Sequence, residues 1–225
     1  AIKIETSDTG TADVYIERTA ATSEALNRRK ISIEANSNSL RIHGEKVDVG
    51  FFARLFGSNP TERVTLRLPR QISLLAKGVN GSLTSGEVEG SVEVHGVNGR
   101  VQIAGAAGTV DFKGINGNIL VGLKRLNSDG VSINGVNGNI ELQLSEGLNA
   151  DLDAHGMNGR LTSDLAEVAI DKTKHGSYTA RIGSGGSAIS AHGINGNIRL
   201  TRAGAASQDN AEAANTKDQS ENSKQ

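Results

Sequence analysis

The 225-residue sequence contains no cysteine and no tryptophan, and only 3% of its residues are aromatic. The absence of cysteine excludes disulfides, zinc–thiolate sites and thiol catalysis. No run of 18 apolar residues occurs, so the sequence predicts no membrane-spanning helix. The formal net charge of −1 provides no bulk attraction to nucleic acid or to an anionic membrane, and we expect no nucleic acid as a partner.

Glycine, by contrast, is abundant, with 28 residues, and much of it belongs to one recurring hexapeptide. The pattern Gly-aliphatic-Asn-Gly-polar-aliphatic occurs six times, with Met once in the first aliphatic place, and the copies begin at Gly78, Gly96, Gly114, Gly135, Gly156 and Gly193. These glycines are 18, 18, 21, 21 and 37 residues apart. A period near 20 indicates a stacked repeat array. The last interval is about two periods, which predicts one degenerate copy between Gly156 and Gly193.

Each repeat divides into two half-units of nine residues. Five glycines are spaced nine apart, at Gly81, Gly90, Gly99, Gly108 and Gly117. Apolar residues alternate after them, and the period of two predicts short strands with one face inward. The residues expected inside are Val101, Ile103, Val110, Phe112, Ile119, Val121, Ile140, Leu142 and Leu144.

The Asn-Gly pairs are predicted to be the corners of the array, because Asn tolerates and Gly prefers the positive φ of a tight reversal. A type I′ hairpin is the alternative reading of Asn-Gly. We favour a coil, since every unit has the same register, which would stack Asn98, Asn116 and Asn137 in one column and Val97, Ile115 and Val136 in another. The predicted corner residues are Asn80, Gly81, Asn98, Gly99, Asn116, Gly117, Asn137, Gly138, Asn158, Gly159, Asn195 and Gly196.

The fold class predicted is therefore all-β, a parallel β-solenoid (β-helix) of short strands with about 18–21 residues per coil. Residues 1–77 are expected to form irregular β strands that continue into the solenoid and cap it, and residues 78–202 the repeats. Residues 24–30 could form one short helical turn. Residues 203–225 contain no apolar residue except Ala and are expected to be a disordered tail, or a flexible tether.

Three of the four phenylalanines, Phe51, Phe52 and Phe56, lie together in residues 49–57. This segment could be a protruding loop that contacts a partner or a lipid surface. The alternative is a plug that packs on the end or side of the solenoid.

A mostly basic column is expected on one outer edge, because three histidines and two lysines precede repeat glycines. Its members are Lys77, His95, Lys113, His155 and His192. The column could bind an anionic polymer such as a cell-surface polysaccharide, or it could be a solvated polar ladder. His95 and His155 are expected about three coils apart, roughly 14 Å, which is too far for one metal ion. A second outward column is expected to comprise Ser82, Arg100, Asn118, Asn139, Arg160 and Asn197.

No known catalytic, cofactor-binding or metal-binding motif occurs, and we expect no cofactor. The enzymatic alternative rests on carboxylate pairs two residues apart, Glu87 with Glu89 and Asp151 with Asp153, because solenoid lyases and glycosidases carry such groups on an outer face. Against it, no cluster of Arg or Lys is expected beside these pairs. The sequence therefore favours a protein that is not an enzyme.

The Gly-Val/Ile-Asn-Gly repeats, the strand at residues 64–69 and the closing residues 182–186 and 193–198 resemble the bacterial putative-adhesin β-strand-repeat family, which is related to the head GIN domains. The resemblance covers about residues 1–202. It implies a β-solenoid in exported or envelope-associated proteins and no catalytic residues.

The resulting expectation is a scaffold or adhesin-like protein of the bacterial cell envelope that binds a cell-surface polysaccharide or an envelope protein. A self-assembling filament module is a further alternative. The chain begins at Ala1, which fits an exported protein whose signal peptide has been removed, in the periplasm, at the cell surface or secreted, and equally a trimmed chain.

Overall fold

The computed structural model describes residues 1–27, 29–46 and 61–204. The described part is almost entirely β, with one five-residue helix, α1 (Ser23–Asn27), where a short helical turn was predicted. The predicted contact loop or plug with Phe51, Phe52 and Phe56 lies outside the described residues, as does most of the predicted tail.

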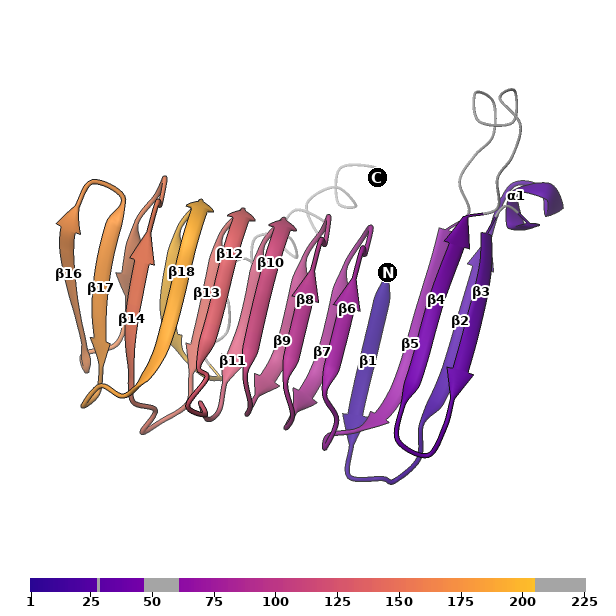
Figure 1. The fold of residues 1–225 in the computed structure, drawn as a ribbon, viewed down its shortest axis with the longest axis horizontal. Helices are drawn as coiled ribbons and strands as arrows, with labels where there is room; N and C mark the ends of the chain where they lie inside the picture. Colours follow the sequence, from indigo (N-terminus) through magenta and orange to yellow (C-terminus); the bar gives the residue numbers. More distant parts are fainter. Residues whose placement is uncertain (28, 47–60, 205–225) are drawn as a thin grey trace, which may run out of the picture.

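Two long sheets extend along the molecule and face each other across a shared core (Figure 1). The nine-stranded sheet contains, in spatial order, β15 (Leu161–Ser163), β19 (Ile198–Arg202), β13 (Ile140–Leu144), β11 (Ile119–Leu123), β9 (Val101–Ala106), β7 (Leu83–Val88), β1 (Ile2–Ser7), β5 (Thr61–Pro69) and β2 (Asp13–Thr19). The eight-stranded sheet contains β16 (Val168–Lys174), β17 (Ser177–Ile182), β14 (Ala150–His155), β18 (Ser187–Asn195), β12 (Val131–Asn137), β10 (Val110–Asn116), β8 (Val92–His95) and β6 (Leu74–Lys77).

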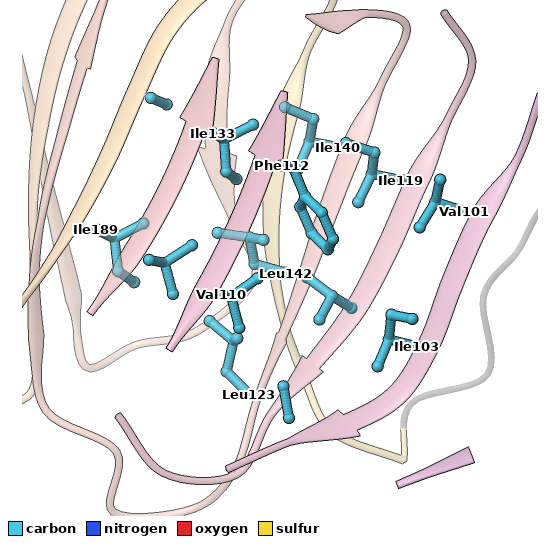
Figure 2. Packing of buried hydrophobic residues seen from close by; sticks show 14 of the residues in the cluster. Val101, Ile103, Val110, Phe112, Ile119, Leu123, Ile133, Ile140, Leu142 and Ile189 are labelled. Carbon is cyan, nitrogen blue, oxygen red and sulfur yellow. The ribbon is translucent and has the colours of Figure 1, made fainter. Parts of the chain in front are cut away.

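From β6 to β15 consecutive strands alternate between the two sheets, and each pairs in parallel with an equivalent strand of a spatially neighbouring repeat. The predicted columns are confirmed: Ile115 is in register with Val136, and Asn116 with Asn137. Buried aliphatic residues from both sheets form one core cluster. Figure 2 shows Val110 and Phe112 of β10 lying near Ile119 and Leu142 of the other sheet. The predicted inward residues are all at most 2% exposed, so the period-two reading is confirmed.

The two glycines of a repeat serve different purposes, as Gly114 and Gly117 show. Gly114 has φ +62, in the left-handed region, and a Cβ there would make only ordinary van der Waals contacts, with the nearest atom 3.9 Å away. Gly117 has φ +149, and a Cβ would lie 2.3 Å from the carbonyl oxygen of Gly99 in the preceding repeat. The first glycine thus provides the bend, whereas the second permits close stacking of backbones.

The repeat asparagines do not share this positive φ, since every described residue with a positive φ is a glycine. The tolerance of Asn for positive φ is therefore not used in the described repeats, where glycine alone adopts it. The side chains of all but Asn80 instead bond to one another along the stack. We call this row the corner ladder; in spatial order it contains Asn80, Asn98, Asn116, Asn137, Asn195 and Asn158.

The spatial order of the repeats differs from their order in the chain. The repeat that begins at Gly193 lies between those of Gly135 and Gly156, because β18 pairs with both β12 and β14 and β19 pairs with both β13 and β15. The predicted degenerate copy is not formed. Strands β16 and β17 occupy that interval as an antiparallel hairpin, with β17 also antiparallel to β14.

At the N-terminus, too, the spatial order of strands differs from their order in the chain. Strand β1 lies between β5 and β7 and is parallel to both, while β2 is antiparallel to β5 and forms the edge of the sheet. Strands β3 (Arg29–Ala35) and β4 (Leu40–Lys46) form a separate antiparallel pair beyond the end of the eight-stranded sheet (Figure 1). Leu40 and Ile42 of β4 pack against the main core, so the hairpin covers its N-terminal end.

Candidate functional site

The predicted Lys/His column lies on the outer face of the eight-stranded sheet, with its members on adjacent strands. The order across the sheet is Lys77, His95, Lys113, Asn134, His192 and His155. His95 and His155 are four strand positions apart rather than three, because β18 lies between β12 and β14. Among the described residues no group of three or more potential ligands could hold a metal ion.

A carboxylate neutralises part of this column. The Oδ2 atom of Asp111 lies 2.6 Å from Nζ of Lys113 and 3.1 Å from Nε2 of His95. Burial opposes ionisation of Asp111, but the hydrogen bonds and charges of Lys113 and His95 outweigh it and lower the pKa of this carboxyl group. Part of the positive charge on the column is therefore compensated within the protein.

The two histidines at the far end of the column form a stacked pair. The ring centroids of His155 and His192 lie 5.7 Å apart, with an angle of 22° between the ring planes. His155 also contacts Asp153, with 2.8 Å between Nε2 and Oδ1, and Ser177, with 3.2 Å between Nδ1 and Oγ. Both ring nitrogens of His155 are thus engaged by Asp153 and Ser177, and the pair belongs to no group of three or more potential metal ligands among the described residues.

The carboxylates considered for catalysis do have basic neighbours, contrary to the expectation from sequence. Glu87 lies 2.6 Å from Nζ of Lys124 and 3.3 Å from a guanidinium nitrogen of Arg70. The hydrogen bond from Lys124 is the main reason that the pKa of Glu87 is lowered. Asp151 lies 3.4 Å from Nε of Arg181. These pairings could not be predicted from the sequence, because the basic partners come from different strands and loops.

A hollow of about 570 Å³ lies over the other sheet, above the second predicted column. We call it the groove. Its lining residues include no aromatic residue and come from strands β9, β11, β13, β19 and β15 and the corners before them; they are Arg100, Gln102, Asn118, Ile119, Leu120, Asn139, Ile140, Glu141, Arg160, Thr162, Asp164, Asn197 and Arg199.

Three asparagines in the groove, Asn118, Asn139 and Asn197, have their amide orientation fixed by the backbone of the next strand. The Oδ1 atom of Asn118 accepts a hydrogen bond from the backbone N–H of Asn139 at 3.0 Å. The Oδ1 atoms of Asn139 and Asn197 accept in the same way, also at 3.0 Å, from Asn197 and Arg160. Each amide oxygen is therefore engaged. The Nδ2 groups of Asn118 and Asn139 have no acceptor among the described residues, so this row presents N–H donors to the groove.

The groove carries three arginines and two carboxylates. Arg199 binds Asp164 through two nitrogens, at 2.6 and 3.0 Å from Oδ2. Glu141 accepts hydrogen bonds from Gln143 at 3.0 Å and Thr201 at 3.2 Å. Arg100 and Arg160 are exposed, and neither forms an ion pair within the described parts of the chain.

Sequence reasoning identified the outward column of Arg100, Asn118 and Asn139 but not the residues beside it. Glu141 and Arg199 lie directly opposite each other in adjacent strands and occupy equivalent repeat positions. The signal was present, since both are two residues after the column in their own repeats. It could not be used without knowing that β19 lies next to β13.

Comparison with known proteins gives little further information. No protein-family model and no curated protein matches the sequence. Among solved structures, the chain is similar to one described as a "putative cell adhesion protein" from Clostridium sporogenes, at 10% sequence identity and a TM-score of 0.37, with 89% of this chain and 87% of that chain covered.

Proposed function

We propose that this protein is a non-enzymatic β-solenoid of the bacterial cell envelope, which presents fixed rows of polar side chains for binding to a surface polymer or another envelope component. The observation that carries the proposal is the register of its repeats. Equivalent side chains such as Asn116 and Asn137, or Asn139 and Asn197, lie directly beside one another in neighbouring strands.

The alternation of consecutive strands between two parallel sheets supports the solenoid. In such an array each backbone strand is held by its neighbours, and the outward side chains repeat about every 4.8 Å. Rows held in this way lose little conformational freedom when a long ligand binds, which favours binding of an extended polymer. The surface is thus suited to a scaffold or adhesin-like role.

The pKa and the contacts of the carboxylates considered for catalysis support a non-enzymatic role rather than that of a lyase or glycosidase. A general acid in glycoside hydrolysis needs a raised pKa, so that it holds its proton near neutral pH. The pKa of Glu87 is instead lowered by Lys124, and Asp151 and Asp153 are engaged by Arg181 and His155. Each of these carboxylates is thus already paired with a basic side chain of the protein.

The described residues include no helix that is long and apolar enough to cross a membrane. The extracytoplasmic location is part of the proposal, and fractionation of cells that express the native gene tests it. Recovery in the cytoplasmic fraction alone would contradict this location.

The binding function is tested by incubating the purified protein with isolated cell-wall polysaccharide and measuring both co-sedimentation and release of new reducing ends or unsaturated products. We expect co-sedimentation without release. Product release that depends on Glu87 or Asp153 would instead establish the enzymatic alternative.

A further inference from the structure

The groove on the nine-stranded sheet combines hydrogen-bond donors with uncompensated positive charge. Its exposed donors are the guanidinium groups of Arg100 and Arg160 and the Nδ2 groups of Asn118 and Asn139. An arginine that has no carboxylate partner provides up to five N–H donors for carboxylate or phosphate. A ligand of the groove must therefore supply hydrogen-bond acceptors, preferably negatively charged ones.

The two arginines mark the ends of the asparagine row. Backbone hydrogen bonds place Arg100 beside Asn118, Asn118 beside Asn139, Asn139 beside Asn197 and Asn197 beside Arg160. Four strand steps of about 4.8 Å separate the Cα atoms of the two arginines by roughly 19 Å. A small ion cannot bridge that distance, whereas an extended chain with repeated charges can contact both.

The lining also indicates how the ligand would be held. Sugar-binding surfaces that rely on stacking use aromatic side chains, and none lines this groove. Of the three aliphatic lining residues, Ile119 and Ile140 are buried in the core and Leu120 is partly exposed; the rest of the lining is polar or charged. Recognition must therefore depend on hydrogen bonds and charge.

From these observations we infer that the groove binds an extended polyanionic chain, a polysaccharide or polyol polymer with regularly spaced carboxylate or phosphodiester groups. This inference rests on the proposed function and names its ligand class and its site. Arg100 and Arg160 bind anionic groups of the chain, and the Asn118 and Asn139 amides donate hydrogen bonds to the oxygens between them.

The site differs from the Lys/His column that the sequence suggested for an anionic polymer. In that column the carboxylate of Asp111 already contacts Lys113 and His95. Arg100 and Arg160, by contrast, have no carboxylate partner in the described residues. Glu141 is the groove carboxylate without an arginine or lysine partner among those residues, and it opposes an anionic ligand. Its removal should therefore strengthen binding.

The test measures binding of the full chain to three soluble polymers by biolayer interferometry: polygalacturonate, poly(glycerol phosphate) and neutral dextran. We expect binding to one or both polyanions, weakened by salt, and none to dextran. The double variant Arg100→Gln/Arg160→Gln should bind at least about tenfold more weakly, since each charge-assisted hydrogen bond contributes substantially. Glu141→Gln should bind more tightly. The polyanion that binds more tightly distinguishes carboxylate from phosphodiester ligands.

Two controls make the result specific. Arg125→Gln removes an exposed arginine that does not line the groove, and Lys77→Gln removes a charge from the opposite sheet; both should bind as the wild type does. Circular dichroism should show that all variants are folded. Equal binding by the double variant, or equal binding of dextran, overturns the groove assignment. If cell-wall material still binds in that case, the proposed function stands; if no envelope polymer binds, both fail.

Discussion

Asn195 donates a side-chain hydrogen bond to Asn137 at 2.9 Å, although 58 residues separate the two in the chain. Asn158 in turn donates to Asn195 at 3.1 Å. The last repeat in the sequence is thus held between two earlier repeats, and its insertion places Asn197 and Arg199 in the groove. The composition of the groove depends on this order.

The corner ladder should contribute to stability through its amide hydrogen bonds. Asn137 forms two of them, donating to Asn116 at 3.2 Å and accepting from Asn195. We expect Asn137→Ala to lower the free energy of unfolding by about 1–2 kcal/mol, measured by urea denaturation. The side chain of Asn80, at the end of the ladder, bonds to no described residue. Asn80→Ala is therefore the control, and an equal loss in both variants would contradict the role of the ladder.

The two glycines of one repeat should respond differently to alanine. Gly114→Ala strains a left-handed residue and should cost about 1–2 kcal/mol. Gly117→Ala also forces a Cβ to 2.3 Å from the carbonyl oxygen of Gly99, so backbones must separate, and we expect a loss of at least about 3 kcal/mol. Thermal and urea unfolding measure both. Equal costs would show that the stacking distance is not the constraint at Gly117.

Acid should weaken the contacts of Asp111. Because its pKa is lowered in the folded protein, its contribution to stability is present above the ordinary pKa of 3.8 and is lost as the pH falls through the folded value. We expect Asp111→Asn to be less stable than the wild type at pH 7, with the difference shrinking below about pH 4.

Urea titrations at several pH values measure this difference. Glu89→Gln, which changes an exposed carboxylate outside any ion pair in the described residues, is the control and should not show it. A constant difference between Asp111→Asn and the wild type across the acid range would contradict the assignment.

The sequence predicted the local structure of the repeats well, because the relevant constraints are local. Alternation of Val101 and Ile103 determines which side faces the core, and the recurring hexapeptide determines that Asn98, Asn116 and Asn137 share a column. Both features were confirmed. The Asn-Gly pairs predicted a glycine at each corner but not the division of roles between the two glycines of a repeat.

The order of the repeats could not be predicted from their spacing. Parallel strands with the same pattern of inward residues can stack on either neighbour, so the pattern does not state which repeat is adjacent to which. The 37-residue interval suggested a lost copy, whereas residues 168–182 form a hairpin that allows the chain to return. For the same reason the sequence did not place His192 beside His155, or Arg199 beside Glu141.

Engineered disulfides test the inserted order of the repeats most directly, because the chain contains no cysteine of its own. Neighbouring strands place Cα atoms about 4.8 Å apart, within the range for a disulfide, while strands separated by another are roughly 9.6 Å apart and beyond it. Asn134 is in register with His192, and His192 with His155. The pairs Asn134→Cys/His192→Cys and His155→Cys/His192→Cys should therefore oxidise readily, and Asn134→Cys/His155→Cys should not. Mass spectrometry of the oxidised variants measures how much disulfide forms in each. Efficient crosslinking of Asn134→Cys/His155→Cys, with none in Asn134→Cys/His192→Cys, would contradict the inserted order.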